Sequence, residues 1–249
     1  MMNKTNLLGT AIKNQSKEHI LEKIKKYMRK PYAFFHIVSL NPENILLATK
    51  DQEFQNILSQ GYIQLIDGMG VALGCAFLNI DAGERLTGAD FMELMLKNVK
   101  KEGLRIVLLG GRPNLAKELA DCYGRKYPQI SFHGEEGFQD VHNPKKSEID
   151  HIFKVIADYK PQIVFAAFGS PEQEKFFARH KREFKGIICM GVGGGFDFAT
   201  GKIPRAPVLM RNIGLEWVYR LIVQPWRWRR QMRLIEYIIA VFRAKMTPE

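Results

Sequence analysis

Five short clusters of polar residues and glycines stand where this chain could do chemistry. They are Ser39 with Asn41, Asp67 with Gly68, Gly110 with Gly111, Gly169-Ser170 with Gln173, and Gly193-Gly194 with Asp197. Each cluster follows an apolar run that is typical of a buried strand. The carboxyl ends of parallel strands meet at one edge of a sheet, where ligands bind, so we expect these clusters to contribute to one site.

The clusters offer two kinds of chemistry. A carboxylate such as Asp67 can accept a proton, and consecutive glycines such as Gly193-Gly194 let the backbone approach a ligand closely. Taken singly, each cluster is explained about as well by local structure, since Asp67-Gly68 and Asn41-Pro42 suit turns and Ser170-Pro171 suits a helix start. Their repeated position after strands favours a functional site.

Apolar runs alternate regularly with helical patterns along the chain. Strands are predicted at 32–40, 62–66, 104–109, near 130, and at 162–168 and 186–190; helices are predicted at about 16–29, 44–60, 71–78, 90–101 and 148–159, with another after Pro113. This alternation predicts an α/β fold that is Rossmann-like, with a largely parallel sheet and helices on both faces. We expect residues 1–204 to form the catalytic core and residues 205–249 a helical appendage.

Composition narrows the class of protein. The chain has 249 residues, 46% of them hydrophobic and 25% charged, which is ordinary for a folded soluble domain. The three cysteines are too far apart to suggest a disulfide framework or a metal motif, which favours a reducing compartment. No signal peptide is apparent at the N-terminus and no apolar run reaches the length of a bilayer, so we expect no transmembrane segment.

Positive charge is concentrated near the C-terminus. Nine Arg or Lys against two Glu in residues 205–245 give a net charge of +7 there, out of +11 for the chain. Such a patch predicts a phosphate-bearing partner, which is a nucleotide, a nucleic acid or an anionic membrane surface.

The segment 228–242 is itself amphipathic. Trp228, Met232, Ile235, Ile239 and Phe242 share one face of a helix and Arg229, Arg230 and Arg233 lie on another flank. A basic helix with aromatic residues on its apolar side fits a helix lying in a membrane interface. The alternatives are an ordinary packing helix or a subunit contact. Nucleic-acid binding is not expected, because no recognised nucleic-acid module precedes the segment.

Several familiar motifs are absent or incomplete. The segment Gly68–Gly74 departs from the dinucleotide-binding pattern in its last spacing, and no HExxH, Cys/His ligand set or GxSxG is present. There is also no Asp-x-Asp pair to hold a divalent cation against a nucleotide-sugar diphosphate. We therefore expect no metal and no cofactor, and a leaving diphosphate would be neutralised by Arg side chains and backbone N–H groups.

Seven segments together resemble the WecG/TagA/CpsF family, glycosyltransferase family 26. They are Asn41-Pro42-Glu43, Asp67-Gly68, Arg85-x-Thr87-Gly88-x-Asp90, Leu109-Gly110-Gly111-Arg112-Pro113, Gly169-Ser170-Pro171-Glu172-Gln173-Glu174, Gly191-Val192-Gly193-Gly194, and Arg205-Ala206-Pro207 with Gly214-Leu215-Glu216-Trp217-x-Tyr219-Arg220. The resemblance covers roughly residues 30–235 in the family's order. Ser39 stands where the family commonly has Thr, and Glu172 where Lys is usual.

The resemblance implies an activity and its partners. It implies an inverting, metal-independent glycosyltransferase that moves a sugar from a UDP-sugar donor to a polyprenyl-diphosphate-linked saccharide in the synthesis of a bacterial surface polysaccharide or teichoic acid. The donor sugar is left open among N-acetylmannosamine, its uronic acid and a hexose. Such an enzyme would be peripheral on the cytoplasmic face of the plasma membrane, held at an anionic membrane surface by the appendage; a homo-oligomer is left open.

The resemblance also implies roles for single residues. Asp67 matches the proposed general base, with Glu43 the next candidate, and the substrate pocket would be lined by Ser39, Asn41, Arg85 and Gln173. We expect the nucleotide and its diphosphate to be bound by Gly110, Gly111, Gly169, Ser170, Gly193, Gly194, Asp197, Arg220, Arg227 and Arg230. Two alternatives from other classes are a nucleotide- or NAD-binding, oxidoreductase-like module built on Gly68–Gly74 and a non-catalytic adaptor on the membrane surface.

Overall fold

The computed structural model describes residues 5–99, 103–201, 206–207, 209–210, 216–223, 225 and 228–246, apart from the side chains of 198, 199, 220 and 229–231. Contacts divide the chain into two compact units. Unit 1 comprises Met1–Lys17, Ser39–Thr87 and Pro204–Glu249, and unit 2 comprises Glu18–Val38 and Gly88–Ile203. The predicted division at residue 204 stays a prediction; by its contacts the C-terminal segment belongs with residues 39–87.

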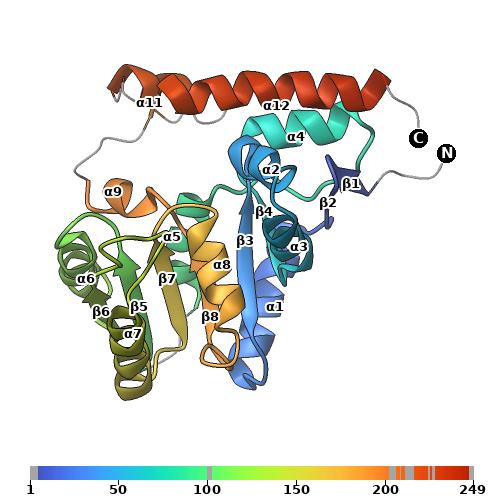
Figure 1. Cartoon of the computed structure of the whole chain (residues 1–249). Coiled ribbons are helices and arrows are strands. Elements are labelled where there is room, and N and C mark those ends of the chain that lie inside the picture. Colours follow the sequence, from blue (N-terminus) through green and yellow to red (C-terminus); the bar gives the residue numbers. More distant parts are fainter. Residues whose placement is uncertain are drawn as a thin grey trace. The chain divides into compact units, whose positions relative to one another are not determined.

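Six strands form one parallel sheet flanked by helices, which confirms the predicted α/β, Rossmann-like fold (Figure 1). The strand order is β4-β3-β8-β7-β5-β6. The strands are β3 (Phe35–Leu40), β4 (Ile63–Ile66), β5 (Leu104–Gly110), β6 (Ile130–Glu135), β7 (Ile163–Ala167) and β8 (Ile188–Gly191). Continuous burial along β3, β4 and β8 explains why the sequence shows unbroken apolar runs there rather than an alternating pattern.

Helices connect and cover these strands. They are α1 (Lys17–Arg29), α2 (Pro42–Ala48), α3 (Gln52–Gln60), α4 (Met69–Phe77), α5 (Gly88–Asn98), α6 (Leu115–Lys126), α7 (Lys146–Tyr159), α8 (Glu172–Arg179), α9 (Gly195–Ala199), α11 (Glu216–Val223) and α12 (Trp228–Met246). The helix expected at about 16–29 agrees with α1 to within one residue.

The single helix predicted over 44–60 is wrong, because the chain forms two helices there. Helix α2 ends at Ala48, and Asp51 starts α3 by accepting a hydrogen bond from the backbone N–H of Phe54 at 3.0 Å. A side chain that caps a helix start favours a new helix over continuation of the old one. Gly61 does end α3, but its φ of −42° shows that no left-handed glycine is needed there.

Two further expectations also need correction. Pro113 does not lie in the first turn of α6, because the cap is Asn114, with φ of +63°, and the helix begins at Leu115. An antiparallel hairpin of β1 (Asn6–Leu7) and β2 (Thr10–Ala11) was not predicted at all. Strands of two residues are too short to show an alternating pattern.

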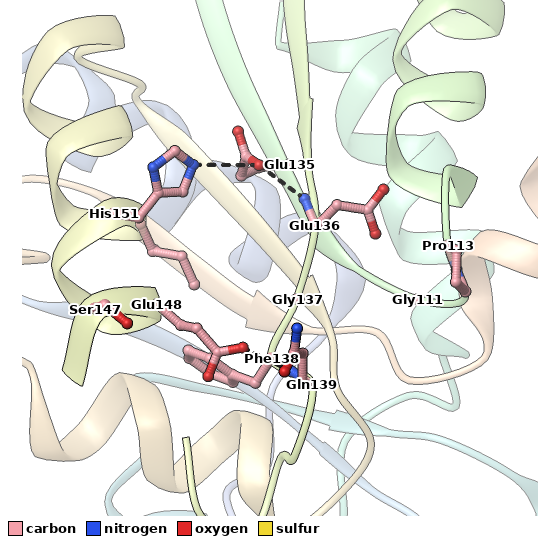
Figure 2. Close-up of a pocket in the computed structure, with 11 residues that line it drawn as sticks. Gly111, Pro113, Glu135, Glu136, Gly137, Phe138, Gln139, Ser147, Glu148 and His151 are labelled. Carbon is pink, nitrogen blue, oxygen red and sulfur yellow. Dashed lines mark hydrogen bonds and ion pairs between the residues drawn. The ribbon is translucent and has the colours of Figure 1, made fainter. Parts of the chain in front are cut away.

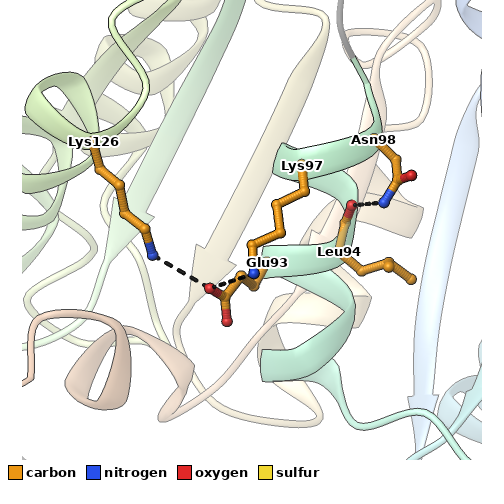
Figure 3. Close-up of polar contacts among 5 residues, drawn as sticks. All are labelled: Glu93, Leu94, Lys97, Asn98 and Lys126. Carbon is orange, nitrogen blue, oxygen red and sulfur yellow. Dashed lines mark hydrogen bonds and ion pairs between the residues drawn. The ribbon is translucent and has the colours of Figure 1, made fainter.

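The core of unit 2 lies between the sheet and helices α7 and α8. Side chains of β7 and β8 pack against Ile152, Ile156, Phe176 and Phe177. At the surface of the same unit, the carboxylate of Glu93 in α5 accepts from Lys97 at 3.2 Å and from Lys126 of α6 at 3.3 Å (Figure 3). The ion pair with Lys97 lies within α5, and the one with Lys126 links α5 to α6.

In unit 1 the long helix α12 packs along α2 and α4 (Figure 1). Tyr237 and Val241 of α12 are buried there, at 2% and 5% exposure. The opposite side of α12 exposes large apolar side chains, namely Trp228, Met232, Ile235, Ile238, Ile239, Phe242 and Met246. This set contains every residue of the apolar face expected from the sequence. Within the described ranges, no helix is both long enough and apolar enough to cross a membrane.

Candidate active site

In unit 1 the backbone brings three of the predicted site segments together. The N–H of Asp67 donates to the carbonyl of Leu40 at 2.8 Å, which ties the end of β4 to the end of β3. Arg85 pairs with Ile66 in an isolated parallel bridge, and Leu86 donates to the Ile66 carbonyl at 3.0 Å. Asp67 and Arg85, which are 18 positions apart in sequence, therefore lie beside the same strand end, and both side chains are partly exposed.

Ser39 and Asn41 contribute differently to this region. The Oδ1 atom of Asn41 accepts from the backbone N–H of Asn44 at 2.8 Å and so caps α2. Ser39 is buried, and its carbonyl accepts from the Asn44 amide at 2.8 Å. In this conformation both segments are held by local hydrogen bonds, so Asn41 serves as a cap as well as a candidate ligand.

Helix α12 holds the first turns of both helices that follow these strand ends. Arg233 forms an ion pair with Glu43 at 2.5 Å, and the hydroxyl of Tyr237 donates to the carbonyl of Gly70 at 3.2 Å. Burial raises the pKa of Tyr237 well above its ordinary value, with Cys75 adding a smaller contribution, so the hydroxyl remains a donor. The segments after β3 and β4 are thus supported by the C-terminal helix within the same unit.

In unit 2 the glycines predicted to bind the nucleotide lie at three adjacent strand ends. Gly110 and Gly111, with φ of +81° and +85°, end β5, and the Gly111 N–H donates to the Ala167 carbonyl at 3.1 Å. Gly169 follows β7 with φ of +89°, and Gly193 follows β8 with φ of +49°. Residues that carry a side chain rarely adopt such φ values, which explains why glycine occupies these turns.

Gln173 ties two of these turns to each other. Its Oε1 atom accepts from the N–H groups of Gly169 at 3.2 Å and Gly193 at 3.1 Å. Its Nε2 atom donates to Ser170 at 3.2 Å and to the buried carboxyl group of Glu174 at 2.8 Å. At 3% exposure Gln173 supports the turns here, and direct contact with a substrate would require these bonds to rearrange.

Arg112 is a candidate phosphate ligand to which the sequence analysis assigned no role. It follows Gly110-Gly111, is exposed, and its Nε atom lies 3.2 Å from Oδ1 of Asp197 in α9. A guanidinium group can exchange a carboxylate partner for a phosphate. Its position directly after a glycine pair at a strand end was the signal in the sequence.

A pocket of about 660 Å³ opens beside the ends of β5 and β6 in unit 2 (Figure 2). It is lined by Gly111, Pro113, Glu135, Glu136, Gly137, Phe138, Gln139, Ser147, Glu148, His151 and Ile152. Its volume is within the range of about 300–1,000 Å³ that is usual for small-molecule sites. Apart from Gly111, these residues are not among the site residues predicted from the sequence, although most of them follow the predicted strand near residue 130.

One acidic residue in the lining of this pocket, Glu135, accepts several hydrogen bonds. Partial burial alone would raise its pKa, but hydrogen bonds from the Glu136 N–H and from His133 and His151 outweigh burial and lower it. Figure 2 shows the imidazole of His151 turned toward Glu135; the two side chains approach to 3.5 Å. Glu135 is therefore an ionised acceptor at neutral pH, suited to a hydroxyl or N–H donor rather than to a phosphate.

Some predicted site residues cannot be placed. Arg227 lies outside the described residues, and the side chains of Arg220 in α11 and Arg230 in α12 are not described. Gly194 and Ser170 lie where expected, in the turns after β8 and β7. Among the residues that are described, no group of three or more His, Cys, Asp or Glu side chains is arranged to hold a metal ion.

The glycines that suggested a dinucleotide-binding module have a packing role in this fold. Gly70 and Gly74 lie within α4, and a Cβ atom on Gly74 would lie 2.3 Å from the Tyr237 hydroxyl. A Cβ atom on Gly70 would lie 2.6 Å from Cγ of Pro42. Both glycines therefore allow close approach of neighbouring side chains, which removes the main sequence argument for an oxidoreductase-like module.

Comparison with known proteins agrees with this architecture. The model of the glycosyl transferase WecG/TagA/CpsF family matches residues 5–249. An N-acetylglucosaminyldiphosphoundecaprenol N-acetyl-beta-D-mannosaminyltransferase of Bacillus subtilis (strain 168) is 33% identical over 207 residues, covering 83% of this chain and 78% of the relative. A protein of the same name from Staphylococcus aureus (strain NCTC 8325 / PS 47) is 28% identical over 232 residues, covering 93% and 88%. The parallel sheet, the clusters at its strand ends and the match along nearly the whole length lead to one conclusion: the chain belongs to the WecG/TagA/CpsF family and is a glycosyltransferase.

Proposed function

We propose that this glycosyltransferase moves N-acetylmannosamine from a UDP donor to a polyprenyl-diphosphate-linked N-acetylglucosamine, with inversion and without a metal ion. The observation that carries the proposal is the family match over residues 5–249, together with relatives whose names specify this donor sugar and acceptor. The uronic acid of N-acetylmannosamine and a hexose remain the competing donors. The product would serve in the synthesis of a surface polysaccharide or teichoic acid.

The proposed step needs one base and one stabilised leaving group. Asp67 accepts the proton of the acceptor hydroxyl as its oxygen bonds to C1 of the sugar, while the bond from C1 to the diphosphate oxygen breaks and UDP departs. Asp67 suits this role because it is partly exposed at the end of β4, beside Arg85. Ser39, Asn41 and Arg85 then orient the reacting sugars.

Unit 2 supplies groups suited to the donor nucleotide. The half-buried ring of Phe138, which packs on Phe168 at 4.9 Å between centroids, offers an apolar surface to a base, and Glu135 can accept from ribose hydroxyls. The acidic lining disfavours phosphates within the pocket itself. The diphosphate would lie instead at the glycine turns, near Arg112.

The decisive measurement is turnover of a panel of UDP-sugars with a short-chain lipid-diphosphate N-acetylglucosamine acceptor. We expect UDP-N-acetylmannosamine to be the preferred donor, the product to be the β-anomer, and turnover to persist in the presence of a chelator. Turnover with another UDP-sugar alone would overturn the donor assignment. Loss of turnover with chelator, restored by a divalent cation, would overturn the metal-free mechanism.

Asp67→Asn tests the assignment of the base. Turnover should fall by roughly two to four orders of magnitude, the usual scale of general-base catalysis, while UDP binding stays within about threefold of the wild type. Glu43→Gln is the matched control, because Glu43 is the nearby alternative base but is paired with Arg233. A larger loss in Glu43→Gln than in Asp67→Asn would exchange the two roles.

We also propose that α12 places the enzyme on the cytoplasmic face of the membrane. Its exposed apolar face, combined with the basic residues of 205–245, suits an anionic lipid surface. Deleting the helix would uncover the surface on which Tyr237 and Val241 are buried, so point substitutions are the cleaner test. Ile235→Glu with Ile239→Glu should weaken sedimentation with vesicles containing anionic lipid, whereas Tyr32→Glu, at an exposed aromatic residue outside the tail, should not.

A further inference from the structure

Glu174 is a fully buried acid in the first turn of α8, and the reaction proposed above does not use it. Its Oε1 atom accepts hydrogen bonds from Nε2 of Gln173 at 2.8 Å and from the hydroxyl of Ser170 at 3.1 Å. Its Oε2 atom is buried and has no partner among the described residues. Burying a carboxyl group with one oxygen unpaired costs stability, so its presence needs an explanation beyond packing.

The two hydrogen bonds that Nε2 of Gln173 donates, to Glu174 and to Ser170, determine which way the Gln173 amide points. A glutamine amide presents an oxygen and a nitrogen of nearly the same shape, and only its partners distinguish the two orientations. Because Glu174 and Ser170 offer acceptors to Nε2 of Gln173, the Oε1 atom of Gln173 faces the other way. There it accepts from the N–H groups of Gly169 and Gly193, which belong to the turns after β7 and β8.

We propose that Glu174 is a positioning residue: its carboxyl group orients the amide of Gln173, which holds the turns of Gly169 and Gly193 in the shape that receives the donor diphosphate. The inference rests on the proposed function, in which these turns frame the diphosphate of a UDP-sugar. Packing adds a constraint, since a Cβ atom on Gly191 would lie within 2.4–2.7 Å of three atoms of the Gln173 side chain. Gln173 is thus enclosed by the turn that it supports.

The charge on Glu174 gives this arrangement a pH-dependent signature. Burial raises the pKa of Glu174 to about 7, with Glu172 on the same helix adding a smaller contribution in the same direction. On the strands packed near α8, burial lowers the pKa of His36 to about 3 and raises that of Cys189, so both stay neutral near pH 7. Above pH 7, Glu174 becomes a buried anion beneath turns that would receive an anionic ligand, and like charges repel.

The test is UDP binding to the full-length protein by calorimetry between pH 6 and 8. Glu174→Gln keeps a carbonyl acceptor for Gln173 but cannot ionise, so its affinity at pH 6 should lie within about threefold of the wild type. Between pH 6 and 8 the wild type should lose at least about threefold more affinity than this variant. Ionisation of UDP itself is common to both proteins and cancels in the comparison.

Glu174→Leu removes the acceptor while keeping similar volume, and should weaken UDP binding by about tenfold or more at pH 6. Glu172→Gln is the matched control, because it removes the other acid of the same helical turn and should retain the pH-dependent loss. Parallel pH profiles for the wild type and Glu174→Gln would overturn the inference, and they decide the matter if Glu174→Leu does not fold. A wild type that binds no UDP at any pH would instead overturn the proposed function and the inference with it.

Discussion

Two glycine-rich segments of this enzyme look alike in sequence but serve different physical purposes. In Gly68–Gly74 of unit 1, Gly70 and Gly74 lie inside α4, where there is no room for a side chain. A Cβ atom would clash with Pro42 at Gly70 and with Tyr237 at Gly74. In Gly191–Gly195 of unit 2, Gly193 has open space around it, and its φ of +49° is the reason for glycine.

The difference teaches how a glycine motif should be interpreted. The segment that came closer to a nucleotide-binding pattern turned out to be a helix-packing surface, and the run of three glycines forms a turn held by a buried side chain. What separates them is the contacts made by residues distant in sequence, namely Tyr237 in the first case and Gln173 in the second.

The largest expected effect concerns the support beneath the second segment. The pKa of Glu174, about 7 in the folded protein, is raised from its ordinary 4.5 by burial. Between these two pH values the unfolded chain has lost this proton while the native state keeps it, so stability falls as the pH rises from 4.5 to 7. Glu174→Gln cannot ionise and does not lose stability in this way. Its free energy of unfolding relative to that of the wild type should therefore rise by about 3 kcal/mol between pH 4.5 and 7.

Urea denaturation of both proteins at several pH values measures this difference directly. Because both proteins share every other titrating group, only the difference between them is interpreted. A constant difference from pH 4.5 to 8 would show that Glu174 titrates normally in the folded state.

Gly74→Ala tests the role of space in the first segment. The new methyl group would lie 2.3 Å from the Tyr237 hydroxyl, so we expect a loss of roughly 1–3 kcal/mol, as for other overpacked sites. Tyr237→Phe removes the nearest atom and should reduce the cost of Gly74→Ala, measured as a double-mutant cycle. Gly124→Ala in α6 is the control: nothing lies within 4 Å, and this change should stabilise by about 0.5–1 kcal/mol.

Gly193→Ala tests the role of conformation in the second segment. No atom lies within 4 Å of the position of the new Cβ, so any loss must come from the positive φ and should be roughly 1–2 kcal/mol. Gly193→Asn should cost less, because Asn tolerates left-handed backbone better than Ala does. Equal losses for both substitutions, measured by urea denaturation, would contradict a conformational origin.

The smallest effect is expected at a surface contact that involves neither glycine segment. Partial burial would raise the pKa of Glu93, but the hydrogen bonds and charges of Lys97 and Lys126 outweigh burial and lower it (Figure 3). This contribution to stability is therefore present above the ordinary pKa of a glutamate and is lost as the pH falls through the lowered value. Glu93→Gln should cost no more than about 1 kcal/mol at pH 7, because the pair is exposed, and the cost should shrink in high salt.

The sequence by itself determined the alternation of elements and the family. Continuous apolar runs such as Phe35–Leu40 identify buried parallel strands because both faces of such a strand are covered. Recognising the strands also placed Asp67 and the glycines of the turns directly after them, where ligands bind in folds of this kind. These are local patterns, which can be recognised in a single sequence.

The tertiary structure alone decided what each of those residues contacts. The pocket beside β6 went unnoticed because Glu135, Phe138 and His151 come from a strand end and a helix whose proximity no spacing reveals. The break between α2 and α3 likewise depended on Asp51 acting as a cap rather than continuing a helix. The structural roles of Gly74, Gln173 and the buried Glu174 depend on partners that only folding brings close. Burial and hydrogen bonding are set by three-dimensional neighbours rather than by position along the chain.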